Sequence, residues 1–395
     1  MFQREAGRSG GVIVSREGHR VTTLELFFDL AYVFAFTQLS RLMAQQHDAT
    51  GVVQALVVLA LLWWSWTAYG WLANLAHADR GIVRVAMIVG MTASFVCGLV
   101  VLEAYQDREG GLYAPMVFVG AYLVARLVHA GVFIALTGPG LRRRTIITMA
   151  LSVVPTGALL VAGALLGSPW QLWLTLAAVA IEPLVAYRSS VGVDWPVRST
   201  AHFTERHGLV VILALGESIL STGVGVLAEP VSTPILAGAV LAMLVCVAMW
   251  WAYFARLTGL AEDALAALPA ARRARAAADG YTYLHLALVA GVVVAALGLE
   301  AAMAHIAEPE AFGTSGAAAL GGGVACYLAG TAGFARRILG AWPVLRLVAA
   351  GALIAGIPLL ALLAPILALT AVAGLLGVLL VAEALAVRRP AYGRA

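Results

Sequence analysis

Two carboxylates four residues apart form the most chemically suggestive pair in this chain. Glu25 and Asp29 lie in the segment TTLELFFDL, and a spacing of four places both on one face of a helix. Two carboxyl groups that lie close together hold a shared proton more tightly, which suits proton or cation binding. The alternative is that they anchor arginine side chains of nearby loops.

A third carboxylate, Glu217 in LALGESIL, lies well inside an apolar stretch. Aligning Leu30 with Leu209 makes Gln38 and Glu217 equivalent positions in the two halves. The same position is therefore an amide in one half of the chain and a carboxyl in the other. A carboxyl there is protonated or paired, and one that changes state can couple to a proton. Glu217 is therefore a candidate for proton coupling, with an interhelical hydrogen bond as the alternative, and Gln38 is a candidate for substrate binding. Gly216, beside Glu217, allows two helices to approach closely.

Arg126 falls in the middle of another apolar stretch, with His129 one turn further on. An arginine at such a depth needs a carboxylate partner or a polar cavity. Arg126 is thus either the counter-ion of Asp29 or Glu217 or the anchor of an anionic substrate. Five tryptophans could line a pocket for an apolar or cationic ligand, with packing as the commoner role: Trp63, Trp64, Trp66, Trp250 and Trp251.

His202 and Glu205 lie three residues apart in HFTERHGL, a spacing that can chelate a metal. No second histidine and carboxylate pair of this kind accompanies them, so neither a di-metal site nor a cofactor is expected. His202 remains a candidate for substrate binding, and Glu205 a candidate for proton or ion coupling. His285 is a lone histidine and is expected to make an ordinary polar contact. The sequence carries no phosphate-binding loop, nucleophile elbow, dinucleotide fingerprint or zinc-protease motif.

The elements that carry these residues are hydrophobic almost throughout. The chain has 395 residues, of which 62% are hydrophobic and 12% charged, and its mean hydropathy is +0.92. Apolar stretches of about twenty residues follow one another, each long enough for a helix to cross ~30 Å of hydrocarbon. They predict an all-α polytopic membrane protein with about twelve transmembrane helices. The predicted helices span 22–43, 51–74, 84–104, 113–136, 145–167, 170–188, 208–227, 233–256, 281–304, 315–334, 344–363 and 366–387.

Arginine accounts for all 25 basic residues and is concentrated in alternate gaps between the stretches. The positive-inside rule then places both termini in the cytoplasm, with a disordered segment 1–20 at the start and a tail 389–395 at the end. Basic loops also explain the pI of about 9.1, and no basic patch with interleaved aromatics supports nucleic-acid binding.

The two halves of the chain share landmarks in the same order. Trp63-Trp64 recurs as Trp250-Trp251, and Glu182 with Arg188 recurs as Glu383 with Arg389. The halves are 21–188 and 208–388, joined by a cytoplasmic linker, 189–207, that leads into the seventh helix. Six helices per half is an even number, which predicts parallel repeats related by a pseudo-two-fold axis along the membrane normal.

Three segments together, ELFFDLAYVFAF, HFTERHGLVVILALGESIL and WWAYFARL, resemble the bacterial low temperature requirement A family over roughly Val21 to Val387. The resemblance implies a multi-pass protein of the bacterial inner membrane. The family name describes a growth phenotype in the cold and implies no reaction or substrate. The positions that carry the resemblance are Glu25, Phe27, Phe28, Asp29, Leu30, His202, Glu205, Arg206, Gly208, Leu209, Gly216 and Glu217.

Three functions are compatible with this sequence. The first is a secondary transporter, proton-coupled in one version, that moves a small organic solute between the two halves. The second is an intramembrane enzyme acting on a lipid or lipophilic metabolite through carboxylates and histidines near the cytoplasmic surface. The third is a membrane stress or accessory protein without turnover. The expected partners are the lipid bilayer and a small-molecule ligand of unknown identity.

Overall fold

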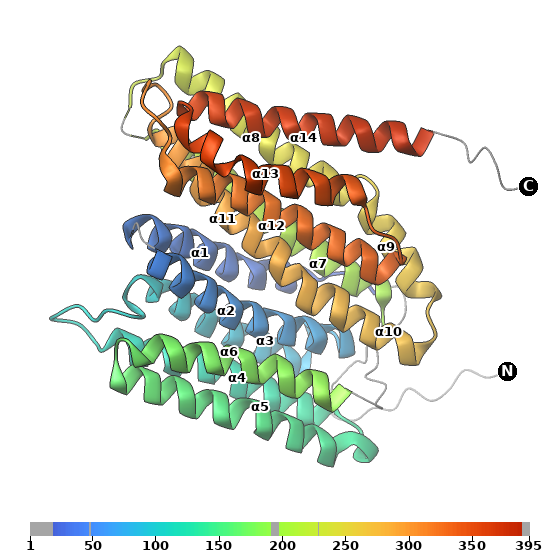
Figure 1. Ribbon diagram of the computed structural model, residues 1–395. Coiled ribbons are helices and arrows are strands. Elements are labelled where there is room, and N and C mark those ends of the chain that lie inside the picture. The colour runs from blue at the N-terminus through green and yellow to red at the C-terminus, as the bar shows by residue number, and fades with distance from the viewer. Residues whose placement is uncertain (1–18, 47–48, 191–196, 228, 389–395) are drawn as a thin grey trace, which may run out of the picture. The chain divides into compact units, whose positions relative to one another are not determined.

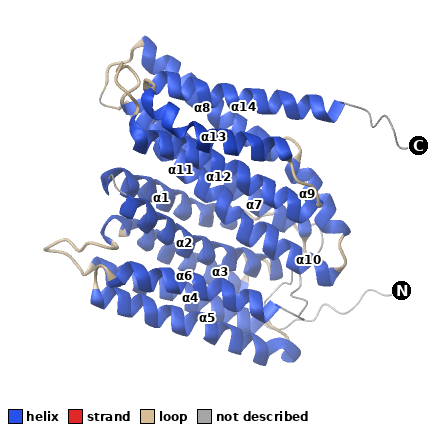
Figure 2. Ribbon diagram, in the orientation of Figure 1, coloured by secondary structure: helices blue, strands red, loops and turns tan. Residues whose placement is uncertain are grey.

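The computed structural model describes residues 19–46, 49–190, 197–227 and 229–388. Within these ranges the chain forms helices joined by loops and contains no strand (Figures 1 and 2). Twelve helices among the described residues are long and apolar enough to cross a membrane. The predicted all-α fold and its twelve spans are thereby confirmed. Residues 1–18 of the predicted N-terminal segment and the whole predicted tail, 389–395, lie outside the described residues.

The helices follow one another in chain order with short connections. The first seven are α1 (Thr23–Gln46), α2 (Ala49–Leu75), α3 (Gly81–Leu99), α4 (Ala114–Leu136), α5 (Pro139–Leu166), α6 (Trp170–Ser190) and α7 (Thr200–Val224), with the 3-10 turn η1 (Val101–Glu103) after α3. The others are α8 (Thr233–Phe254), α9 (Leu257–Ala267), α10 (Ala270–Ala277), α11 (His285–Ala304), α12 (Gly313–Leu339), α13 (Val344–Leu362) and α14 (Pro365–Arg388), with the π-helix η2 (Ala278–Leu284) between α10 and α11.

The chain divides into two compact units. Unit 1 comprises Met1–Gln38, Leu56–Arg206 and Pro269–Ala274, and unit 2 comprises Leu39–Ala55, His207–Leu268 and Arg275–Ala395. In unit 1, α3 packs on α4, α4 on α5, and α5 on α6. In unit 2, α11 packs on α12, α12 on α13, and α14 on α8. The boundary therefore runs through α1, α2, α7 and α10, whose two ends belong to different units.

In unit 2, glycines bring α11 and α12 into backbone contact. A Cβ at Gly298 would overlap the backbone of Leu320, and a Cβ at Gly323 would overlap the backbone of Ala295. Glycine lets two membrane helices approach this closely, which gains dispersion contacts where the hydrophobic effect between helices is absent. Gly216, by contrast, has no atom of another helix within 4 Å of where its Cβ would be, so the close approach that this glycine allows does not occur among the described residues.

Gly298→Ala is expected to destabilise the protein, whereas Gly322→Ala is not. The added methyl at Gly298 meets the backbone of Leu320, while the same methyl at Gly322 has no atom within 4 Å. Overpacking of this kind costs about 1–3 kcal/mol, against a helix-propensity gain of roughly 0.5–1 kcal/mol. Thermal unfolding of both variants in one detergent measures the difference. Equal melting temperatures would contradict the backbone contact.

The start of α7 is the main departure from the predicted boundaries. The helix begins at Thr200, eight residues before the predicted position at residue 208. The segment 200–207 carries four charged or titratable side chains, His202, Glu205, Arg206 and His207, which are costly to bury without partners. In the folded chain, His202 and Arg206 are buried because each meets a carboxylate of α1, so the cost of burying them is offset.

A buried ion-pair network and its candidate proton site

The N-terminus of α1 is closed by a capping box. The backbone N–H and hydroxyl of Thr22 donate to Glu25 Oε2 at 2.8 and 2.9 Å, and the backbone N–H of Glu25 lies 3.4 Å from Thr22 Oγ1. This is the reciprocal pairing that Thr-x-x-Glu favours at a helix start. The side chain of Glu25 is thus held in place while it is fully buried.

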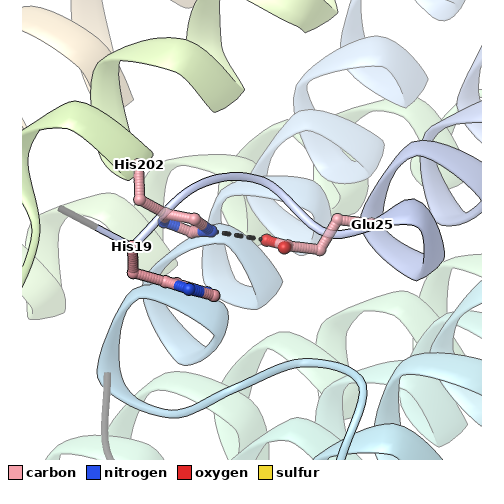
Figure 3. Close-up of side chains that lie close together, drawn as sticks. All are labelled: His19, Glu25 and His202. Atoms are coloured by element: carbon pink, nitrogen blue, oxygen red, sulfur yellow. Dashed lines mark hydrogen bonds and ion pairs between the residues drawn. The ribbon is translucent and has the colours of Figure 1, made fainter. Parts of the chain in front are cut away.

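Two residues of α7 face the two carboxylates of α1. His202 Nε2 lies 2.8 Å from Glu25 Oε1, a contact drawn in Figure 3. Arg206 Nη2 donates to Asp29 Oδ1 at 2.9 Å, and its Nη1 lies 3.5 Å from Glu25 Oε1. Each pair is spaced by four residues, so one face of α1 matches one face of α7. All four side chains are buried.

Aromatic side chains surround the guanidinium of Arg206. Its central carbon lies 5.3 Å from the ring of Trp66 and 5.6 Å from the ring of Phe28, both cation–π distances. Trp66 Nε1 also donates to Asp29 Oδ1 at 2.8 Å. Water is therefore replaced around the charges by rings and by fixed donors, which strengthens each ion pair in the low dielectric.

Asn74 on α2 determines which nitrogen of His202 carries the proton. The backbone N–H of Arg198 donates to Asn74 Oδ1 at 2.8 Å, and Asn74 Nδ2 donates to the Ser199 carbonyl at 2.7 Å. These two contacts fix the amide, whose Nδ2 also lies 3.3 Å from His202 Nδ1. His202 Nδ1 must therefore accept, and the ring proton sits on Nε2 and is donated to Glu25. A second ring proton on Nδ1 would face the amide N–H of Asn74, so the neutral tautomer protonated at Nε2 fits these contacts.

With His202 neutral, the buried charges do not cancel. Glu25 and Asp29 contribute two negative charges and Arg206 one positive charge, which leaves a net charge of −1. Both oxygens of Glu25 accept hydrogen bonds, whereas Asp29 Oδ2 is buried without a hydrogen-bond partner. A buried charge without a counter-charge is energetically expensive. A proton on Asp29 Oδ2 would neutralise the network.

His19 lies beside this network. Its ring stacks on His202 with centroids 5.0 Å apart (Figure 3) and meets His77 edge-on at 4.1 Å. Ligand atoms of His19, Glu25 and His202 lie within 4.8 Å of one another, which raises the question of a metal ion. A metal would need the lone pair of His202 Nε2, but that nitrogen carries the proton, and Arg206 would repel a cation beside Glu25. Burial, followed by the neighbouring imidazoles, lowers the pKa of His19. The donor set therefore suits a hydrogen-bonded network better than a metal.

A second buried network in unit 1 links α4, α5 and α6 around Glu182. Arg126 Nε donates to Glu182 Oε1 at 3.0 Å, and the Tyr122 hydroxyl donates to Glu182 Oε2 at 2.6 Å. The hydroxyl of Ser152 lies 3.4 Å from Glu182 Oε1. The partner of Arg126 is therefore Glu182. His129, one turn from Arg126, is buried beside the ring of Tyr69.

The other predicted site residues occupy several places. In unit 2, Glu217 is buried and accepts a hydrogen bond from Ser221 Oγ at 3.0 Å. Glu205 is partly exposed and pairs with Arg20 at 3.7 Å. Gln38 and Trp63 are buried in unit 1, where Trp63 stacks on Trp66, and Trp64 is half-buried. Trp250 and Trp251 lie on an exposed face of α8.

His285 makes the ordinary polar contact that was expected. Its Nδ1 lies 2.9 Å from the Gly280 carbonyl, within the π-helix η2, and its Nε2 lies 2.6 Å from the Tyr253 hydroxyl. Nδ1 therefore carries the proton and Nε2 accepts from the tyrosine. Both ring nitrogens are satisfied, which leaves none for a ligand.

Two residues that matter in unit 1, Asn74 and Tyr122, were not singled out from the sequence. Arg206, Trp66 and Glu182 were noted there, but without these pairings. A signal for Arg206 was present, because His202 and Arg206 repeat the spacing of Glu25 and Asp29. It becomes readable only when residues 200–206 are taken as helical. Asn74 and Trp66 are remote in sequence from their partners, and no local pattern connects them.

Comparison with known proteins identifies relatives over most of the chain. The family profile described as bacterial low temperature requirement A protein (LtrA) matches residues 20–381. The chain is 29% identical over 326 residues to the uncharacterized protein RA0937 of Rhizobium meliloti (strain 1021). The aligned region covers 78% of this chain and 75% of that protein. No solved structure gives a significant match. Both buried networks fall inside the matched residues.

Proposed function

Because this chain belongs to the bacterial low temperature requirement A (LtrA) family of multi-pass membrane proteins, we propose that it is a proton-coupled secondary transporter of a small organic solute. The observation that carries this proposal is the unbalanced charge of the α1–α7 network. Two buried carboxylates face one arginine and a neutral histidine, and one carboxylate oxygen has no partner. Intramembrane carboxylates in such surroundings act as proton relays in transporters.

In this proposal Asp29 binds and releases the coupling proton. When Oδ2 is protonated, the network is neutral, and Arg206 remains paired with Glu25 and with Asp29 Oδ1. When Oδ2 loses its proton, the network carries a net negative charge, which favours a state in which water or a solute reaches the carboxylate. Glu217, buried in the other unit, is a second candidate for coupling.

The proposed topology places the protein in the bacterial inner membrane with both termini in the cytoplasm. Support comes from the arginines in alternate loops, which follow the positive-inside rule. The proposal also keeps two parallel six-helix repeats. Their supporting landmarks are Glu182 and Glu383, near the ends of α6 and α14, each of which pairs with a buried arginine.

Asp29→Asn is expected to abolish proton coupling while the protein still folds. The asparagine keeps an oxygen for Arg206 and Trp66 but cannot exchange a proton at neutral pH. The purified protein in liposomes with an entrapped pH dye would be tested against a panel of amino acids, organic acids and amines. Wild type and Glu205→Gln, which alters a partly exposed carboxyl, should show solute-driven proton movement. Asp29→Asn should show none, and infrared spectra should lose one protonated-carboxyl band.

Different outcomes would contradict the proposal at different points. Normal proton movement by Asp29→Asn, or an unchanged infrared spectrum, removes Asp29 from coupling. A solute that is recovered with altered mass shows an enzyme. Failure of every solute to move protons or to shift the melting temperature favours the accessory protein.

A further inference from the structure

A groove between α5 and α6 carries a polarity gradient along its length. It measures about 810 Å³ and is lined at one end by Arg143, Arg144 and Arg188. Ile147 and Leu151 line its wall on α5, and Leu184 lines it on α6. None of the described residues that line the groove is acidic.

Helix geometry sets the order of these side chains. Arg143, Ile147 and Leu151 are spaced by four residues, so they follow one face of α5 over about 12 Å at 1.5 Å per residue. Leu184 precedes Arg188 by one turn on α6. The start of α5 and the end of α6 lie at the same end of the helix pair, so their arginines meet there and their leucines meet further along.

The guanidinium groups of Arg143, Arg144 and Arg188 gather at this end of the groove. Arg144 Nη2 donates to the carbonyl of Ser189 at 2.7 Å, which holds this side chain across the end of α6. Arginine presents planar donors that match phosphate oxygens in two parallel hydrogen bonds. Thr148, on the buried floor of the groove, adds a hydroxyl within the same region.

The apolar wall decides what kind of anion fits. Ile147, Leu151 and Leu184 are all about half exposed, at 46%, 57% and 53%, on helices that are long and apolar enough to cross a membrane. A soluble anion would use the arginines and leave this wall unused. A phosphate joined to acyl chains would use both ends, with its charge at the arginines and its chains along the leucines.

We propose that the α5–α6 groove is a binding site for an anionic glycerophospholipid. The lipid phosphate lies among Arg143, Arg144 and Arg188, and an acyl chain runs along Ile147, Leu151 and Leu184. This site is separate from the proposed transport function, since it contains none of the residues of the α1–α7 network.

The test uses the full-length protein in nanodiscs and measures retained lipid by native mass spectrometry. Wild type should retain phosphatidylglycerol in preference to phosphatidylcholine. Arg143→Gln/Arg188→Gln should weaken that retention by roughly tenfold or more, since each juxtamembrane arginine contributes about 1 kcal/mol toward anionic lipid. Arg80→Gln/Arg84→Gln removes the same charge beside Asp79, outside the groove, and should retain the lipid normally.

The remaining arms separate the lipid from a free anion. Leu151→Ser/Leu184→Ser keeps every arginine, and it should weaken phosphatidylglycerol retention while leaving stabilisation by inorganic phosphate unchanged. Equal retention of the two lipids by wild type overturns the proposal. So does an equal loss in the Arg80→Gln/Arg84→Gln control, which would show a general surface charge effect. Thermal stabilisation by inorganic phosphate equal to that by phosphatidylglycerol assigns the groove to a soluble anion instead.

Discussion

Arg206→Gln is expected to be among the most damaging single substitutions in unit 1. It removes the guanidinium that pairs with both Glu25 and Asp29, and it leaves two buried carboxylates beside each other. Breaking a buried ion pair by removing one partner typically costs 3–5 kcal/mol, so a loss of about 3–5 kcal/mol in the free energy of unfolding is expected. Thermal or denaturant unfolding in detergent measures it.

A matched control separates burial from charge. Arg108 pairs with Glu103 at 3.7 Å, but its side chain is largely exposed, so Arg108→Gln should change stability by less than about 1 kcal/mol. The double variant Arg206→Gln/Asp29→Asn should recover part of the loss, because it also removes one of the two stranded carboxylates. If Arg206→Gln were as stable as Arg108→Gln, water would reach the network, and the argument from its net charge of −1 would fail.

Glu182→Gln should have an effect of similar size. Glu182 accepts hydrogen bonds from Arg126 and Tyr122, and its replacement leaves the guanidinium of Arg126 buried without a counter-charge. The expected loss is again about 3–5 kcal/mol. Glu383→Gln serves as the comparison. Glu383 accepts two hydrogen bonds from Arg346, but its side chain is 26% exposed, so a smaller loss of stability is expected.

The double variant Arg126→Met/Glu182→Met tests the role of Arg126. Replacing both partners of a buried ion pair by apolar groups is often neutral or stabilising, so this variant should unfold at nearly the wild-type temperature. Retained transport would show that Arg126 is structural. A folded protein that binds no anionic solute would show that Arg126 is a substrate anchor. A double variant less stable than Glu182→Gln alone would contradict the pairing itself.

The membrane spans were predictable because a run of about twenty apolar residues has the length and composition that a helix needs to cross a bilayer. The faces of those helices were not. In a membrane, the side that meets lipid and the side that meets other helices are both apolar, so periodicity does not separate them. Trp63 and Trp250 illustrate this, since both were candidates for a pocket wall, yet Trp63 is buried while Trp250 is exposed.

Polar pairings between distant helices depend on packing that local sequence does not encode. Arg126 was expected to meet Asp29 or Glu217, and Glu182 became its partner only through the contact of α4 and α6. The proximity of Glu25 to Asp29 was predictable from their spacing. The tautomer of His202 was not, because it depends on the Asn74 amide of α2, which is held by two backbone groups just before α7.

The glycine contact between α11 and α12 has a mechanical consequence. At Gly298 and Gly323 the two helices touch through backbone atoms, with no side chain between them to change rotamer. Because no side chain at these contacts can change rotamer to absorb a shift, α11 and α12 are expected to move together as one rigid pair within unit 2. In any conformational change of unit 2, we therefore expect the other helix pairs to shift relative to α11 and α12.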